Sequence, residues 1–243
     1  MMKLLLTLLF VTQIFGQYPD AIELLQKIDE NMSASNQVIV STMVIHGRRS
    51  NRSITSKSWI EGEDKSFTEY LAPAREKGTK MLKLGDQLWM YSPQSDRTIR
   101  ISGHMLRQSM MGSDLSYEDM MEDRKMFEIY TGEIVGEELY DENDCWILDL
   151  TAKVDDIAYH SQKLWIDKVY MVPRKQQLFA KSGKMLKVIE LSDLFQIDDR
   201  WYPKRMLFQD ALLKGKGTEW IIESIKFDYN IPNHIFSKAS LRK

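Results

Sequence analysis

The residue types that most often carry out chemistry in enzymes are few and scattered in this sequence. The four histidines are His46, His104, His160 and His234. They lie far apart and match no spacing of metal ligands, so they predict no metal centre. Gly112-Ser113-Asp114 has the start of a nucleophile turn, but the second glycine of a G-x-S-x-G elbow is missing. Residues 141–144, Asp-Glu-Asn-Asp, lack the glycine and the final glutamate of a calcium-binding loop.

Composition argues against several further classes of function. The chain has no glycine-rich phosphate loop and no basic, aromatic pattern for nucleic acid, and its net charge is −2. Its one cysteine, Cys145, cannot form an intramolecular disulfide and is more typical of a buried apolar side chain than of a nucleophile. We therefore expect no cofactor, no nucleic-acid partner and no enzymatic activity. A catalytic site assembled across strands would leave no local motif, so catalysis stays open as a third hypothesis.

Residues 1–16 have the pattern of an export signal. Lys3 precedes an apolar run at residues 4–10, and Gly16 is small enough for signal-peptidase cleavage. The apolar run is too short to span a membrane as a permanent helix. No cysteine follows the cleavage site, so a lipid anchor is not expected there. We predict that residues 1–16 are a cleaved signal peptide and that residues 17–243 form one exported, soluble domain.

The elements that must position any site are mostly strands. Residues 19–34 have apolar positions at helical spacing and predict one amphipathic helix. From residue 37 onward, short strand-like runs alternate with polar or glycine-containing turns, which is typical of antiparallel pairing. About 11–12 strands exceed what a twisted flat sheet usually holds. The predicted fold class is therefore mainly β, a single sheet rolled into a barrel or part-barrel with the helix at its mouth.

A methionine-rich stretch interrupts the strand pattern. Residues 88–92 and 98–102 predict a β-hairpin. The methionines that follow are Met105, Met110, Met111, Met120, Met121 and Met126. Their soft, unbranched side chains favour a lid over an apolar space of variable shape. We call residues 105–126 the lid segment; ordinary core packing by its methionines is the alternative.

The lid segment also has signals for a helix and for hinges. Ser116 and Asp119 have the spacing of a capping box, which predicts a short helix beginning near Ser116. Gly103 and Gly112 precede that helix and are candidate hinges, because glycine adopts backbone conformations that other residues avoid. A segment hinged at these glycines would open and close over a cavity.

Alternation along two strands groups several large side chains. Trp89 and Tyr91 share one face of their strand, and Trp146 and Leu148 share one face of theirs. The six tryptophans are spread over the strands, and large aromatic residues commonly fill the interiors of barrels. Most of them are therefore interpreted as structural. The functional alternative is that a minority line a ligand cavity.

Several short motifs resemble those of one known family. They are Tyr70-Leu71-Ala72-Pro73, Lys77-Gly78-Thr79, Leu88-Trp89-Met90-Tyr91-Ser92-Pro93 and Met111-Gly112-Ser113-Asp114-Leu115-Ser116-Tyr117-Glu118-Asp119. Together with the export signal, they resemble the outer-membrane lipoprotein-sorting protein family, bacterial periplasmic proteins similar to the lipoprotein carrier LolA. The resemblance covers essentially the whole mature chain. It implies an unclosed antiparallel β-barrel with helices across its opening and an apolar cavity between them.

The resemblance also implies a function. Acyl chains of lipoproteins, or another lipid, would lie between the curved sheet and the lid segment for transfer toward the outer membrane. We expect a periplasmic monomer in transient contact with membranes, with an inner-membrane exporter and an outer-membrane acceptor as partners. The alternative is a sensory or interaction module that works with a membrane exporter or signalling partner, with lipid binding secondary. An empty apolar cavity would favour the carrier, and a packed interior would favour the module. The expected lipid-binding residues are Trp89, Tyr91, Met105, Leu106, Met110, Met111, Leu115, Met120, Trp146 and Leu148.

Overall fold

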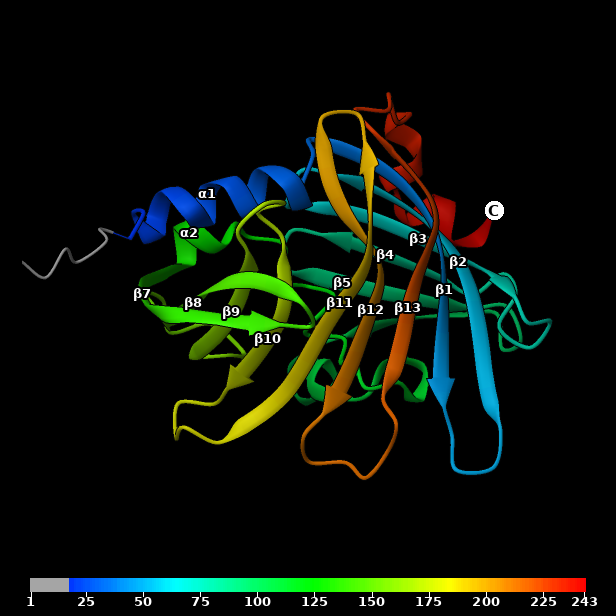
Figure 1. Cartoon of the computed structure of the whole chain (residues 1–243). Coiled ribbons are helices and arrows are strands. Elements are labelled where there is room, and N and C mark those ends of the chain that lie inside the picture. Colours follow the sequence, from blue (N-terminus) through cyan, green and yellow to red (C-terminus); the bar gives the residue numbers. More distant parts are fainter. Residues whose placement is uncertain (1–17) are drawn as a thin grey trace, which may run out of the picture.

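A single antiparallel sheet of 13 strands forms the body of the protein in this computed structural model, which describes residues 18–243 (Figure 1). The predicted export signal lies outside the described residues. The strands are β1 (Asn36–His46), β2 (Asn51–Glu61), β3 (Lys65–Ala72), β4 (Lys80–Leu84), β5 (Gln87–Ser92), β6 (Arg97–Ile101), β7 (Tyr130–Tyr140), β8 (Asn143–Ala152), β9 (Ser161–Asp167), β10 (Pro173–Phe179), β11 (Met185–Ile197), β12 (Arg200–Asp210) and β13 (Thr218–Phe227).

The order of the strands leaves the barrel open. Across the sheet it is β6-β5-β4-β3-β2-β1-β13-β12-β11-β10-β9-β8-β7, so β6 and β7 are the two edges. Every neighbouring pair except β1 and β13 is consecutive in the chain. The sheet is therefore a meander whose first and last strands meet in its middle. This confirms the predicted unclosed antiparallel sheet, with 13 strands in place of the expected 11–12.

The first helix, α1 (Ala21–Met32), confirms the helix predicted near the N-terminus. Asp20 caps it, because its Oδ1 accepts hydrogen bonds from the backbone N–H groups of Ile22 and Glu23 at 2.8 and 3.0 Å. The apolar side of α1 is buried against β7, β8 and β9 and the short helix α2 (Met126–Ile129). Burial of its three most buried apolar side chains is worth roughly 1.5–3 kcal/mol each relative to exposure. They are Leu24, Leu25 and Ile28.

The lid segment folds as turns, and the helix expected to begin at Ser116 is absent. The segment contains part of one 3₁₀ turn, η1 (Gly103–Arg107), and all of another, η2 (Met110–Gly112). The capping box does form: the N–H of Ser116 donates to Asp119 (2.6 Å), and the N–H of Asp119 donates to the Ser116 hydroxyl (3.1 Å). Only single-turn bonds follow it. Starting a helix is unfavourable, and Asp119 is held by groups from β11 and the β8–β9 loop, so the tertiary contacts prevail.

Strand register decides which side chains share a face, because opposed residues on antiparallel strands point the same way. Following the register from strand to strand places the lid segment and α1 over the same face, which we call the inner face. Met81 and Met90 lie on it under the lid segment, and Leu148 lies on it under α1. The outer face of β1 and β3–β5 is covered by the C-terminal turns η3 (Asn233–Phe236) and η4 (Lys238–Arg242).

Within residues 18–243, no helix has the length and apolar character needed to cross a membrane.

Candidate functional site

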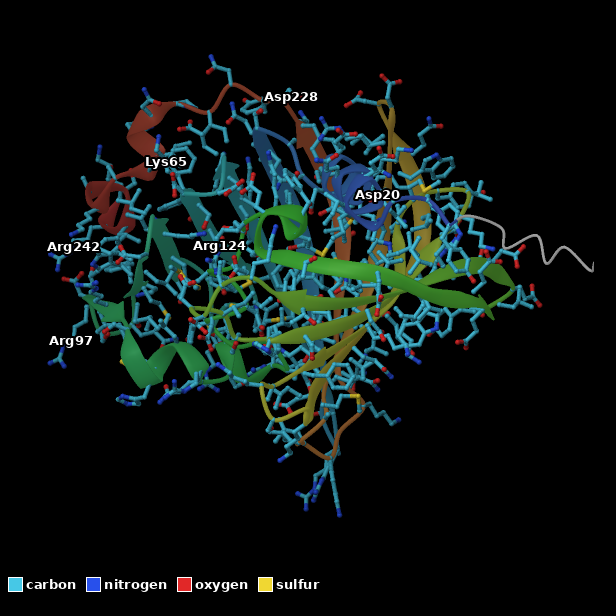
Figure 2. The ribbon with its side chains drawn as sticks, turned by 90° about the vertical axis from the view of Figure 1, so that its left-hand side faces the viewer. Asp20, Lys65, Arg97, Arg124, Asp228 and Arg242 are labelled. Atoms are coloured by element: carbon cyan, nitrogen blue, oxygen red, sulfur yellow. The ribbon has the colours of Figure 1, made fainter. Side chains whose placement is uncertain are left out.

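An open cleft of about 1070 Å³ lies on the inner side of the sheet. One wall is the C-terminal half of α1 and the turn after it, and the other is formed by β1, β2 and the β2–β3 turn. Residues 122–125 at the end of the lid segment, Phe127 of α2 and Arg200 of β12 complete the lining. In Figure 2, Arg124 is labelled beside α2, below α1. The cleft thus lies where α1 and the lid segment meet over the sheet.

The cleft has a small apolar part and a charged rim. Met32, Ile60 and Phe127 supply apolar surface, whereas acidic side chains from α1, the β2–β3 turn and residues 122–123 predominate around them. Gln37 reaches the cleft with its side-chain oxygen buried and without a hydrogen-bond partner among the described residues. A ligand or a water molecule that donates to this oxygen would satisfy it. The lining therefore suits a ligand with both an apolar and a polar part.

Asp29 ties α1 to the floor of this cleft. Its side chain is buried, and the backbone N–H of Phe127 donates to its Oδ2 at 3.1 Å. Burial raises the pKa of Asp29 above the ordinary value of 3.8, and the hydrogen bond from Phe127 opposes that rise. The carboxyl group thereby links α1 to α2 in the lining of the cleft.

Two buried lysines hold the lid segment to the inner face. Lys83, in β4, donates at 2.8 Å to the carbonyl oxygens of both Glu63 and Met121, and it pairs with Asp123 at 2.5 Å. Its side chain is only 4% exposed. Burial raises the pKa of Asp123, and the adjacent Lys83 ammonium acts against that rise. The ammonium group thus has three hydrogen-bond acceptors, one of them a carboxylate, which offset the cost of burying its charge.

Lys187, in β11, makes the second anchor to the same inner face, from the other half of the sheet. Its ammonium group pairs with Asp119, and the hydroxyl of Tyr159 donates to the same carboxylate at 2.5 Å. Burial and the neighbouring carboxylate raise the pKa of Tyr159, so this hydroxyl keeps its proton as a donor. The capping carboxylate predicted to start a helix is therefore the centre of a buried ionic network.

The far end of the lid segment is fixed by further polar contacts. Arg52 donates to the carbonyl oxygen of Met111. The hydroxyl of Thr218 donates to Asp114 at 2.7 Å, and the N–H of Asp210 donates to the same carboxylate at 3.2 Å. Gly112 has a φ of 71°, a region in which glycine is favoured. The lid segment is thus attached to β2, β4, β11 and β13 in the structure.

Six of the predicted lipid-binding residues belong to the lid segment and lie together where it packs on the inner face. Met110 and Leu115 are buried, and the other four are partly buried around them. They pack on Met43, Met81 and Tyr70 of the inner face, so the protein's own side chains fill this region. The six residues are Met105, Leu106, Met110, Met111, Leu115 and Met120. The candidate hinges Gly103 and Gly112 lie just before and within this cluster.

The other four predicted residues lie elsewhere. Trp146 and Leu148 are on the inner face beneath α1. Trp89 and Tyr91 are on the outer face, where they pack with the C-terminal turns, and Lys238 lies 4.1 Å from the centre of the Trp89 ring. The structure therefore divides the ten residues into three groups and does not bring Trp89 or Tyr91 to the lid segment or the cleft.

Sequence reasoning missed the cleft and the two lysine anchors. A signal was present, because Lys83 and Lys187 each stand inside an apolar strand run, where a charged residue is rarely buried unless paired.

Cys145 is fully buried, as predicted, and burial raises the pKa of its thiol to about 11. The thiol is therefore protonated near neutral pH. Residues 18–243 contain no group of three or more His, Cys, Asp or Glu side chains arranged to hold a metal ion.

One protein-family model matches most of the chain. A family model described as "Uncharacterized protein" matches residues 62–243. The chain belongs to this family. None of the curated proteins compared with the chain matches it.

Three solved structures share the fold of this chain. A protein from Vibrio parahaemolyticus described as an outer membrane lipoprotein-sorting protein domain has a TM-score of 0.79 at 21% identity, covering 91% of this chain and 98% of that one. A DUF1329 family protein from Desulfovibrio piger has a TM-score of 0.80 at 24% identity (90% and 97% covered). A LolA superfamily protein from Nitrosomonas europaea has a TM-score of 0.76 at 22% identity, covering 92% of this chain and 100% of that one. The predicted resemblance is confirmed as a likeness of fold.

Proposed function

We propose that this protein is a periplasmic, non-enzymatic carrier that binds acyl chains of lipoproteins or another lipid between the inner face, α1 and the lid segment. The observation that carries the proposal is the open cleft of about 1070 Å³ between α1 and the sheet. Pockets for small molecules commonly measure about 300–1,000 Å³, so the space is ample for a lipid headgroup and part of a chain. The shared fold with a protein described as lipoprotein-sorting supports this class of cargo.

The route of the acyl chain follows from the position of the lid segment. Residues 122–125 line the cleft, and Met120 and Met121, directly before them, pack into the methionine cluster. An acyl chain entering from the cleft would displace these side chains, and methionine repacks at low cost because it is unbranched and flexible. In this proposal the methionine cluster, which the protein's own side chains fill, opens as cargo enters.

The energetics suit reversible transfer. Each methylene group removed from water is worth roughly 0.8 kcal/mol, so burying a sixteen-carbon chain gains on the order of 10 kcal/mol over exposure. A membrane offers the chain nearly the same gain. The protein therefore needs only near parity with the bilayer, and a self-filled interior that must be opened keeps the binding from becoming too tight.

Native mass spectrometry with lipid extraction tests the proposal on protein purified from its own periplasm. We expect bound lipid on the wild-type protein and on Ala74→Trp, which adds an indole to an exposed loop. Ala34→Trp places the same bulk in the cleft and should lower the lipid-bound fraction. A wild-type protein that carries no lipid, and that binds no fluorescent fatty acid, would contradict the carrier and favour the interaction module.

A further inference from the structure

Three neighbouring hairpin tips at one end of the sheet are strongly basic. They are residues 47–52 (the β1–β2 turn and the first two residues of β2), residues 180–184 between β10 and β11, and residues 211–217 between β12 and β13, at the bottom of Figure 1. Together they hold seven lysine and arginine side chains and no acidic one. The whole chain has a net charge of −2, so all other residues together carry −9. We call these three segments the basic tips.

The fold brings the basic tips together. The N–H of His46, the residue just before the first tip, donates to the carbonyl oxygen of Gly217 in the third tip at 3.2 Å. The N–H of Ala211 donates to the carbonyl oxygen of Leu186 at 2.9 Å. This bond joins the third tip to β11, the strand that follows the second tip. The turns at the other end of these strands are acidic. The β11–β12 turn carries Asp198 and Asp199, and the β2–β3 turn carries Glu63 and Asp64. The charge of the molecule is therefore segregated along the strand direction.

Most cations of the basic tips are free to meet an external anion. Arg48, Arg49, Lys214 and Lys216 are exposed, and none of them forms an ion pair with any of residues 18–243. Lys181 has only a loose contact, 3.7 Å, with the fully exposed Asp155. In Figure 2 the lowest tips end in side chains with nitrogen atoms. Like charges so close repel one another, and an anionic surface would relieve that repulsion.

Two adjacent leucines protrude among these cations. Leu212 is 53% exposed and Leu213 is 59% exposed, at the start of a loop that continues as Lys-Gly-Lys-Gly. Exposed apolar side chains flanked by lysines match the chemistry of an interfacial membrane anchor, in which lysines meet lipid phosphates and leucines enter the acyl boundary. An acidic protein surface would satisfy the lysines but would gain little from two protruding leucines.

We infer that the basic tips form a docking surface for an anionic phospholipid bilayer, with Leu212 and Leu213 entering its interface. This goes beyond the proposed function, because it does not require the cleft to hold lipid. The surface adjoins the lid segment: Arg52 donates to Met111, and Thr218 and Asp210 donate to Asp114. A membrane bound at the tips therefore lies next to the methionine cluster.

Vesicle binding tests the charge part of the inference. The purified protein should sediment with vesicles of equal parts phosphatidylglycerol and phosphatidylcholine, not with phosphatidylcholine alone, and added salt should weaken the binding. Each Lys or Arg near an anionic surface is worth about fivefold in binding, so Arg48→Ser/Arg49→Ser and Lys214→Ser/Lys216→Ser should each bind roughly 25-fold more weakly. The matched control is Arg97→Ser/Arg100→Ser, which removes two exposed charges from β6. An equal loss in the control would overturn the inference.

A fluorescent label tests the leucine part. Leu213→Cys, carrying an environment-sensitive dye, should shift to the blue with the anionic vesicles, whereas Leu139→Cys, at an exposed position of β7, should not. The native Cys145 is fully buried, so it does not compete for the dye. Binding that leaves the dye at residue 213 in water would overturn insertion. A wild-type protein that ignores anionic vesicles would overturn membrane docking and leave an acidic protein as the occupant.

Discussion

Asp29 shows how a single buried carboxyl group can make stability depend on pH. Burial raises its folded-state pKa above 3.8, so the folded protein holds this proton more tightly than the unfolded chain does. That stabilising contribution is fully present below pH 3.8 and is lost as the pH rises through the raised pKa. Near neutral pH, the buried charge therefore lowers the free energy of unfolding.

Replacing Asp29 with asparagine should remove this penalty while keeping an acceptor for the N–H of Phe127. We expect Asp29→Asn to raise the free energy of unfolding near neutral pH by on the order of 1 kcal/mol, the usual scale of one substitution. The gain should vanish below pH 3.8, as measured by urea unfolding. Glu30→Gln, at the exposed next position of the helix, should change little at either pH. An equal gain at both pH values would contradict the assignment to Asp29.

Trp89 is the residue for which the predicted role and the observed position differ most. Its ring is buried on the outer face with Phe67, Leu82 and the C-terminal turns. Trp89→Ala should lower the free energy of unfolding by about 3–5 kcal/mol and leave the affinity for a fluorescent fatty acid unchanged. Trp146→Ala, on the inner face under α1, is the matched comparison. If Trp89→Ala stays folded and binds the fatty acid more weakly, the outer face contributes to the site.

Among the elements, the lid segment owes its position to buried ionic contacts as much as to its methionines. Lys83→Met should remove the ammonium group from three acceptors and leave Asp123 unpaired. Removing one partner of a buried pair usually costs about 3–5 kcal/mol, and we expect about 2–3 kcal/mol here because Asp123 is partly solvated. Urea unfolding measures the loss, and hydrogen exchange should show lower protection near Met121. The double variant Lys83→Met/Asp123→Asn should recover part of the stability.

A cross-link tests whether the lid segment is a gate. Asp114 and Thr218 are in direct contact, so Asp114→Cys/Thr218→Cys places two thiols between the lid segment and β13. When this disulfide is oxidised, exchange of bound fatty acid should slow, and reduction should restore the rate. The single variants control for the lost hydrogen bond. Equal exchange rates in both redox states would show that the methionines are core and that the lid segment does not gate.

The whole molecule combines three coverings on one sheet: α1 and the lid segment share the inner face, and the C-terminal turns cover part of the outer face. The charge is segregated, with the acidic cleft rim and the basic tips at different places on the surface.

Export of the whole protein is the remaining prediction at this scale. N-terminal sequencing of protein from its native host should begin at or near Gln17. Recovery of an intact Met1 in a membrane-embedded protein would contradict a soluble carrier.

Local pattern in the sequence was enough to predict the order and type of most elements. Alternation and turn residues predicted a meander of short strands, and helical spacing predicted α1, because both signals come from neighbouring residues. The cluster of lid-segment methionines was also predictable from composition. The pairing of β1 with β13 was not, because it joins residues at opposite ends of the chain and leaves no local signal.

Only the tertiary structure decided which face each side chain serves. Alternation shows that Trp89 and Tyr91 share a face, but the curvature of the sheet and the elements that cover it make that face the outer one. Ser116 and Asp119 form their capping box, yet the carboxylate also pairs with Lys187, sixty-eight residues away, and no helix follows. Burial of Lys83 likewise depends on acceptors from two distant turns. Each outcome rests on contacts between segments far apart in sequence, which local spacing does not encode.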